Sequence, residues 1–178
     1  MPVYIAMLRG VNVGRNSLKM ERLREICMGL GFTNARTYVQ SGNVVFKAKG
    51  SPSGWCGKFE RALAAEVRLP VSILVRTPAE MRAIVARNPF LKRKSIETAK
   101  LHVTLLMEMP SKAARGALTK IAAGGDEYRL AGKNIYVYCP NGYGRTKLSN
   151  NALEKALGVR ATTRNWNTVN MLCAMTAE

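Results

Sequence analysis

The order of strand-like and helix-like segments in the first half of the chain recurs in the second half. Apolar residues alternate or run together as in strands, or recur every three to four positions as in helices. This predicts strands at 3–9, 36–40, 44–48 and 71–76, and helices at 18–30 and 58–69. The order βαββαβ is that of the ferredoxin-like unit, also called the split βαβ or α/β plait.

The second half repeats this order and adds a helix at its end. Strands are predicted at 101–107, 127–130, 135–138 and 159–163, and helices at 111–122, 148–157 and 168–175. A further helix over 77–87 begins with Thr-Pro-Ala-Glu, a capping box with proline at the first helical position. We therefore expect an α+β protein of two tandem ferredoxin-like halves plus a C-terminal helix. Its domains would be 1–90 with an extra helix, a polar linker at 91–100, and 101–178.

The chain carries 28 Lys and Arg against 11 Asp and Glu among 178 residues, a net charge of +17. The excess is divided evenly, with net charges of +9 on residues 1–90 and +8 on residues 91–178. An apolar content of 47% excludes a disordered basic tail, which lacks the hydrophobic side chains to offset the entropy of ordering. A folded basic body indicates an anionic partner: nucleic acid, a phosphorylated small molecule or an anionic membrane surface.

Several other classes are disfavoured by the sequence. No apolar run approaches the roughly 18 residues of a membrane span, and the N-terminus lacks the pattern of a signal peptide. The four cysteines are widely separated, with no C-x-x-C pair and no histidine at metal-ligand spacing. We expect a cytoplasmic protein with no membrane partner, no disulfide framework, no metal and no cofactor.

Two polar segments of the first half are candidate ligand loops. The segment at 9–16 follows the first strand, and its glycines and cations suit an anion near a helix start. The tip of the hairpin at 40–43 contributes further hydrogen-bonding groups. The candidate ligand residues here are Arg9, Asn12, Gly14, Gln40, Ser41 and Asn43. Turn geometry alone also accounts for both segments, so a purely structural role stays open.

Two more polar segments lie in the second half. The loop at 140–147 places two glycines and two cations before a helix, as a phosphate site would need. The run at 162–168 surrounds one tryptophan, which could stack on a nucleotide base beside a cation. The candidates are Gly144, Arg145, Lys147, Arg164, Asn165, Trp166 and Asn167. The alternatives are a plain basic loop, and a helix capped by Thr163 or Asn165 with Trp166 in the core.

No catalytic residue can be assigned from the sequence. His102 is the single histidine, and a lone histidine in a strand is usually structural. No Ser-His-Asp, Cys-His or paired-carboxylate arrangement is present, so whether the chain is an enzyme stays open. Tyr136 and Tyr138 share one strand face that suits base stacking, although the aromatic signature of RNA recognition motifs is missing.

The segment LRGVNVGRNSLKMERLREICMGLGFTNARTYVQSGNVVF at 8–46 resembles an uncharacterised bacterial family, domain of unknown function 1697. So do NPF at 88–90, LHVTLL at 101–106, GRTKLSNNALEKALGV at 144–159 and ATTRNWNTV at 161–169. The resemblance implies a compact protein of two ferredoxin-like halves and brings no activity, cofactor or catalytic residue. Arg15 and Asn16 depart mildly from the family pattern, in which further glycine or lysine is expected.

The four polar segments lead to one functional hypothesis and two alternatives. We expect them to converge on a phosphate-bearing ligand, with nucleic acid favoured because the whole body is basic. An enzyme or sensor for a small phosphorylated metabolite or nucleotide could use the same loops as a pocket. A scaffold or oligomerising domain is the third reading, because several strands are apolar on both faces.

Overall fold

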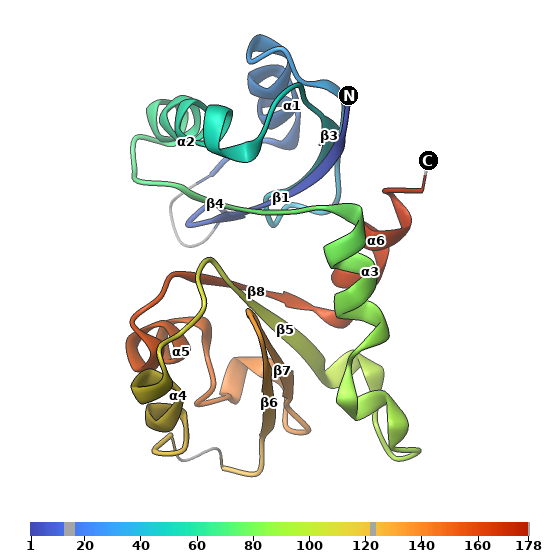
Figure 1. Ribbon diagram of the computed structural model, residues 1–178, viewed down its shortest axis with the longest axis vertical. Helices are drawn as coiled ribbons and strands as arrows, with labels where there is room; N and C mark the ends of the chain where they lie inside the picture. Colours follow the sequence, from blue (N-terminus) through green and yellow to red (C-terminus); the bar gives the residue numbers. More distant parts are fainter. Residues whose placement is uncertain (13–16, 122–123, 178) are drawn as a thin grey trace. The chain divides into compact units, whose positions relative to one another are not determined.

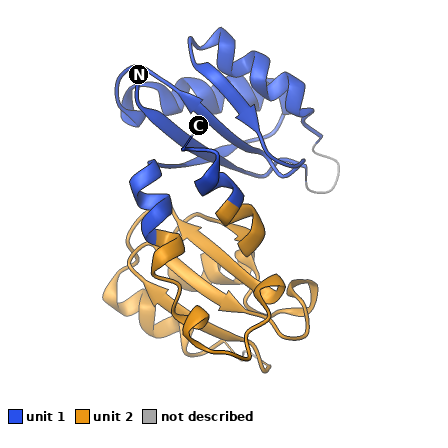
Figure 2. Ribbon diagram, turned by 90° about the vertical axis from the view of Figure 1, so that its right-hand side faces the viewer, with its two compact units in different colours: residues 1–83, 171–178 blue, residues 84–170 orange. Residues whose placement is uncertain are grey.

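The computed structural model describes residues 1–12, 17–121 and 124–177. They group into two compact units (Figure 2), unit 1 with residues 1–83 and 171–178 and unit 2 with residues 84–170. The division falls within helix α3 (Pro78–Ala86) and near the end of helix α6 (Trp166–Ala174). Residues 171–178 thus belong to unit 1, whereas the sequence analysis grouped them with the second half.

Unit 1 is a four-stranded antiparallel sheet with two helices on one face (Figure 1). Its elements are β1 (Val3–Arg9), α1 (Met20–Gly29), β2 (Thr33–Thr37), β3 (Asn43–Lys47), α2 (Pro52–Val67) and β4 (Ser72–Arg76). The strand order is β2-β3-β1-β4, so the first strand lies between the third and the fourth. This is the ferredoxin-like arrangement.

Unit 2 has the same topology. Its strands are β5 (Leu101–Leu106), β6 (Glu127–Ala131), β7 (Asn134–Tyr138) and β8 (Ala161–Asn165), in the order β6-β7-β5-β8 and all antiparallel. The helices are α4 (Lys112–Leu118) and α5 (Asn150–Leu157), with 3-10 turns η1 (Pro89–Lys92), η2 (Thr98–Lys100) and η3 (Tyr143–Arg145). The predicted fold, two ferredoxin-like halves with a C-terminal helix, is confirmed.

Alternation along the strands places one set of side chains in each core. In unit 1, alternate residues of β1 point toward α1 and α2, where Phe46 and Phe59 are fully buried. Five aromatic rings pack there, with Phe32 stacked on Phe46 at 4.6 Å between centroids and Trp55 edge-on to Phe46 at 5.4 Å. In unit 2 the equivalent layer holds buried side chains of β5, β7, α4 and α5. Burial of these apolar surfaces is the main stabilising term of each unit.

The other face of the unit 2 sheet is also covered, which changes the expected role of two tyrosines. Tyr136 is 1% exposed and donates a 2.9 Å hydrogen bond from its hydroxyl to the Ile84 carbonyl. Tyr138 is 8% exposed, and its ring centroid lies 6.1 Å from that of Phe90. The segment from Ile84 to Phe90 therefore occupies the face on which bases would stack. The expectation that these tyrosines suit base stacking is wrong for this structure.

Several element bounds differ from those predicted. Helix α2 begins at Pro52 instead of residue 58, because proline suits a first helical turn and Trp55 joins the core. Strand β2 ends at Thr37, and Val39 two residues later has a φ of 48°, which no strand can hold. Helix α6 begins at Trp166 instead of 168. Among the described residues, no helix combines the length and the apolarity needed to cross a bilayer.

Candidate functional site

In unit 1 the end of β1, the segment after it and the β2–β3 hairpin are joined by main-chain and amide hydrogen bonds. The Leu8 N–H donates to the Gly42 carbonyl at 2.8 Å. The Asn12 amide donates to the Gln40 carbonyl and, at 3.0 Å, to the Leu18 carbonyl, while its oxygen accepts from the Leu18 N–H at 2.7 Å. Asn12 and Gln40, both predicted ligand residues, are thus in contact. The Asn12 amide links the segment after β1 to the β2–β3 hairpin, and we call this region the hairpin corner.

The other predicted residues of unit 1 lie in the hairpin corner or outside the described part. Asn43 is fully buried and donates to the Tyr38 carbonyl at 3.1 Å and to the Ser41 hydroxyl at 2.7 Å. Arg9 is half-buried at the end of β1, opposite Ser72 of β4. Gly14 lies outside the described residues. The amide of Asn43 is therefore engaged within the hairpin, and the side chains exposed at its tip are Gln40 and Ser41.

In unit 2 the loop between β7 and α5 presents two exposed cations. Gly144, Arg145 and Lys147 are exposed, and neither cation forms a salt bridge with a carboxylate of the described residues. A hydrogen bond to a neighbouring segment holds the loop in place: the Thr146 hydroxyl donates to the Asp126 carboxylate at 2.5 Å. The only aspartate of the chain thus supports this loop without pairing with its cations.

Main-chain donors at the start of α5 already have partners within the protein. The Leu148 N–H donates to the Thr146 hydroxyl at 3.0 Å and the Asn150 N–H to the Tyr143 hydroxyl at 3.1 Å. The Ala152 N–H donates to Ser149, the N-cap, at 3.3 Å. The expectation of a phosphate cradle built on this helix start therefore needs revision. What the loop offers an anion is its two cationic side chains.

The segment after β8 is built around a helix cap. Asn165 accepts a 2.8 Å hydrogen bond from the Thr168 N–H and so caps α6, while Trp166 is 5% exposed. Arg164 is buried and donates to the Thr162 hydroxyl at 2.7 Å and the Thr163 carbonyl at 2.9 Å. Burial lowers the pKa of the Arg164 guanidinium to about 10. The cap-and-core alternative matches this geometry, and ligand contacts by Arg164, Asn165, Trp166 and the exposed Asn167 stay a prediction.

A polar cluster around His102 was not anticipated from the sequence. The His102 ring stacks on Tyr143 at 4.4 Å between centroids, and the Thr104 and Thr163 hydroxyls lie 2.7 Å apart across β5 and β8. Thr163 also donates to the Asn150 amide oxygen at 3.0 Å. The signal available was the alternation that places residues 102 and 104 of β5 on one face. The cluster attaches the 140–147 loop and the start of α5 to the sheet.

The stability of the protein should depend on pH through this histidine. Burial lowers the pKa of the His102 imidazole below its ordinary 6.5, and the nearby Lys100 main chain opposes this only in part. The unfolded chain then binds a proton at His102 more readily than the folded chain does. The contribution of His102 to the free energy of unfolding is therefore fully present above pH 6.5 and is lost as the pH falls below that value. We expect urea unfolding to show lower stability at about pH 5.5 than at about pH 7.5, by at most about 1.4 kcal/mol per pH unit.

Since the chain has one histidine, a His102→Gln variant is the matched control and should show a smaller loss over the same range. A nuclear magnetic resonance titration measures the imidazole directly. A pKa at or above 6.5 would contradict this account of the cluster.

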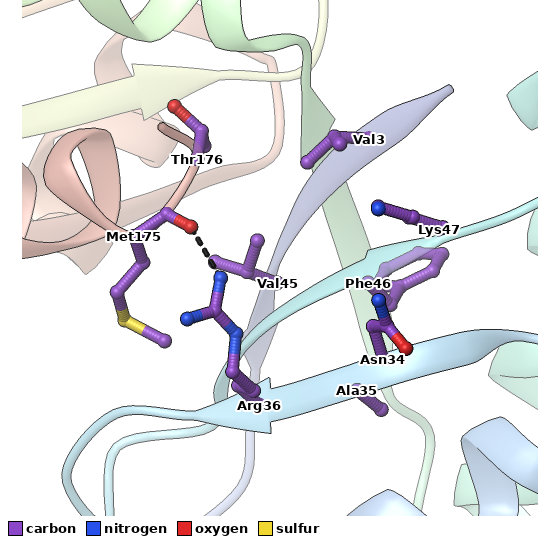
Figure 3. Close-up of a pocket in the computed structure, with 9 residues that line it drawn as sticks. All are labelled: Val3, Asn34, Ala35, Arg36, Val45, Phe46, Lys47, Met175 and Thr176. Atoms are coloured by element: carbon purple, nitrogen blue, oxygen red, sulfur yellow. Dashed lines mark hydrogen bonds between the residues drawn. The ribbon is translucent and has the colours of Figure 1, made fainter. Parts of the chain in front are cut away.

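A cavity of about 340 Å³ lies in unit 1 at the edge of the sheet (Figure 3). It is bordered by β1, β2, β3 and the C-terminal segment, and its cations are Arg36 and Lys47. None of the described residues among the predicted ligand contacts lines it. The sequence analysis does not predict this cavity, because in the sequence Arg36 and Lys47 are indistinguishable from ordinary surface cations of two strands. Within the described part of the chain, no three His, Cys, Asp or Glu side chains are grouped as a metal site would require.

Comparisons with known proteins agree with the fold and with the sequence resemblance. A family model described as "Protein of unknown function (DUF1697)" matches residues 1–136. A solved structure, that of the conserved bacterial protein SP0830 from Streptococcus pneumoniae, matches with a TM-score of 0.77 at 20% identity. The match covers 100% of this chain and 99% of that chain, and at this identity it supports the shared fold. No curated protein matches the chain.

Proposed function

We propose that this chain, which belongs to the family described as Protein of unknown function (DUF1697), binds nucleic acid through contacts to backbone phosphates. The observation that carries the proposal is the pair of exposed cations, Arg145 and Lys147, on the ordered loop before α5. Held two residues apart on a supported loop, they can contact neighbouring phosphates without a large loss of loop entropy.

The chemistry of this loop favours a polyanion over a small phosphorylated molecule. A small phosphate ligand needs converging donors in a concave site, with main-chain N–H groups among them. Here the main-chain donors of Leu148, Asn150 and Ala152 are used internally, and the side-chain charges face outward. Separate outward cations suit a chain of phosphates, where each contact releases a counterion.

A second group of cations in unit 2 supports the same reading. The exposed cationic side chains on and beside η1 and on β6 are those of Arg87, Lys92, Arg93, Lys94 and Arg129. The guanidinium carbon of Arg93 lies 5.9 Å from the Phe90 ring centroid and that of Arg129 lies 5.7 Å from it, so both cations contact one aromatic ring. Glu127 pairs with Arg93 at 2.8 Å and offsets one charge of the group. The remaining positive charges add to a surface that attracts polyanions.

The test is the salt dependence of binding to a labelled single strand and duplex of DNA and to RNA. The wild-type protein should lose affinity steeply as salt rises, because phosphate contacts release counterions. Arg145→Gln combined with Lys147→Gln should reduce the slope of log K against log salt by about 2. Fluorescence anisotropy at several salt concentrations measures both quantities.

The matched control removes two exposed cations elsewhere in unit 2, Lys112→Gln with Lys120→Gln, for the same change of net charge. This control should leave the slope nearly unchanged if the loop makes the contacts. Equal effects of the two double variants, or no retention of any nucleic acid at low salt, would refute the proposal.

A further inference from the structure

We propose that the cavity of unit 1 binds a small organic anion that has one anionic head group and an apolar body. The cavity has a volume of about 340 Å³, which would hold on the order of ten water molecules at about 30 Å³ each. That suits a small aromatic or aliphatic acid and is too small for an oligonucleotide. The cavity is formed by residues of unit 1 and the loop proposed to bind nucleic acid by residues of unit 2, so each proposal can be tested without the other.

Two cations give the cavity its charge. Arg36 donates a 2.5 Å hydrogen bond to the Met175 carbonyl, which holds the C-terminal segment in place as one wall (Figure 3). Lys47 is half-buried, and its side-chain ammonium forms no hydrogen bond or salt bridge with another of the described residues. Among the described residues that line the cavity, none carries a carboxylate. A half-buried ammonium with no carboxylate partner in the described part of the chain gains most from an anion that enters the cavity.

The local backbone explains why polar groups face this space. Strand β2 is an edge strand that pairs only with β3, and its register shifts between Thr33 and Arg36. Asn34, within the shift, has a φ of 53°, a left-handed conformation that asparagine adopts more readily than most residues. Such a bulge turns side chains out of the regular alternation. It brings the Asn34 amide to the cavity, where it can donate to the second oxygen of a carboxylate or phosphate.

The remaining walls are apolar and define the other half of the ligand. Val3, Val45 and Met175 border the cavity, and Figure 3 shows Val45 between the Arg36 side and the side of Asn34 and Lys47. A polar molecule without an apolar part would leave these surfaces unfilled, whereas a hydrocarbon would leave Lys47 unpaired. The combination selects a carboxylate or phosphomonoester that carries a small hydrocarbon group.

The experiment titrates the full chain with benzoate and with phenyl phosphate and follows the amide resonances by nuclear magnetic resonance. We expect saturable shifts centred on Asn34, Arg36, Lys47 and Thr176, with the stronger of the two ligands identifying the head group. Benzamide, the neutral analogue of benzoate, should bind at least about tenfold more weakly, because the charge-assisted contact is lost.

Lys47→Gln should weaken binding about tenfold, and Lys47→Arg should retain most of it. Lys49→Gln, an exposed neighbour beyond the end of β3, makes the same change in net charge and should have no effect. Absence of saturable shifts with both ligands, shifts centred elsewhere, or equal effects of Lys47→Gln and Lys49→Gln would overturn the proposal. Nucleic acid binding by the Lys47→Gln variant should equal that of the wild type, which keeps this test distinct from the earlier one.

Discussion

Replacing Gly42 with alanine should lower the free energy of unfolding by about 3 kcal/mol, through overpacking and backbone strain together. Gly42 has a φ of 71°, in the left-handed region. A Cβ at this position would lie 2.4 Å from Cγ2 of Val11 and 3.0 Å from Cβ of Leu8. Both neighbours are buried, so neither can move aside cheaply. Urea unfolding of the variant, followed by circular dichroism, measures the loss.

Gly50→Ala is the matched control, because Gly50 has a φ of 75° and open space where the Cβ would lie. Gly50→Ala should lower the free energy of unfolding by only about 1 kcal/mol, the cost of placing alanine in left-handed backbone. Adding Val11→Ala to Gly42→Ala should recover part of the stability, since it removes the atom that clashes. Equal losses at Gly42 and Gly50, or no recovery in the double variant, would show that close packing is not what requires glycine here.

The fold could be predicted because its signals are local. The short apolar runs of β1 and β7 and the helical spacing in α1 and α5 are visible in short windows of sequence. The capping box of α3 is also local: the Thr77 N–H donates to Glu80 at 2.7 Å and the Glu80 N–H to Thr77 at 3.2 Å. Strand β2 was misplaced because four of its five residues are polar or charged and show no alternation. Its position depends on pairing with β3, which is a tertiary effect.

The candidate site was harder to predict, because residue type does not separate a ligand contact from a turn contact. The side chains of Asn12, Asn43 and Asn165 were candidates for ligand hydrogen bonds, and each is bonded to the main chain of its own unit. Asparagine serves both purposes, since its amide can replace a main-chain partner in a turn. The cavity was missed for a different reason. It joins Arg36 to Met175, 139 residues away, and no local pattern reports such a contact.

Asn12→Asp should lower the free energy of unfolding by about 3 kcal/mol at neutral pH, since it leaves two main-chain acceptors unpaired beside a charge. The aspartate would still accept from the Leu18 N–H, as the amide oxygen does at 2.7 Å. Its second oxygen, however, would face the carbonyls of Leu18 and Gln40, to which the amide nitrogen now donates. Urea unfolding at neutral pH measures this cost directly.

Asn12→Gly separates the side chain from the backbone, because glycine tolerates the φ of 54° at this position. Loss of the amide contacts alone should cost about 2 kcal/mol, and Asn12→Ala should cost about 1 kcal/mol more for its left-handed backbone. The Asp variant should regain stability at acidic pH relative to the Gly variant, because a protonated carboxyl can donate to one of the two carbonyls. If instead all three variants are as stable as the wild type, Asn12 does not organise the hairpin corner, and its amide is available for a ligand.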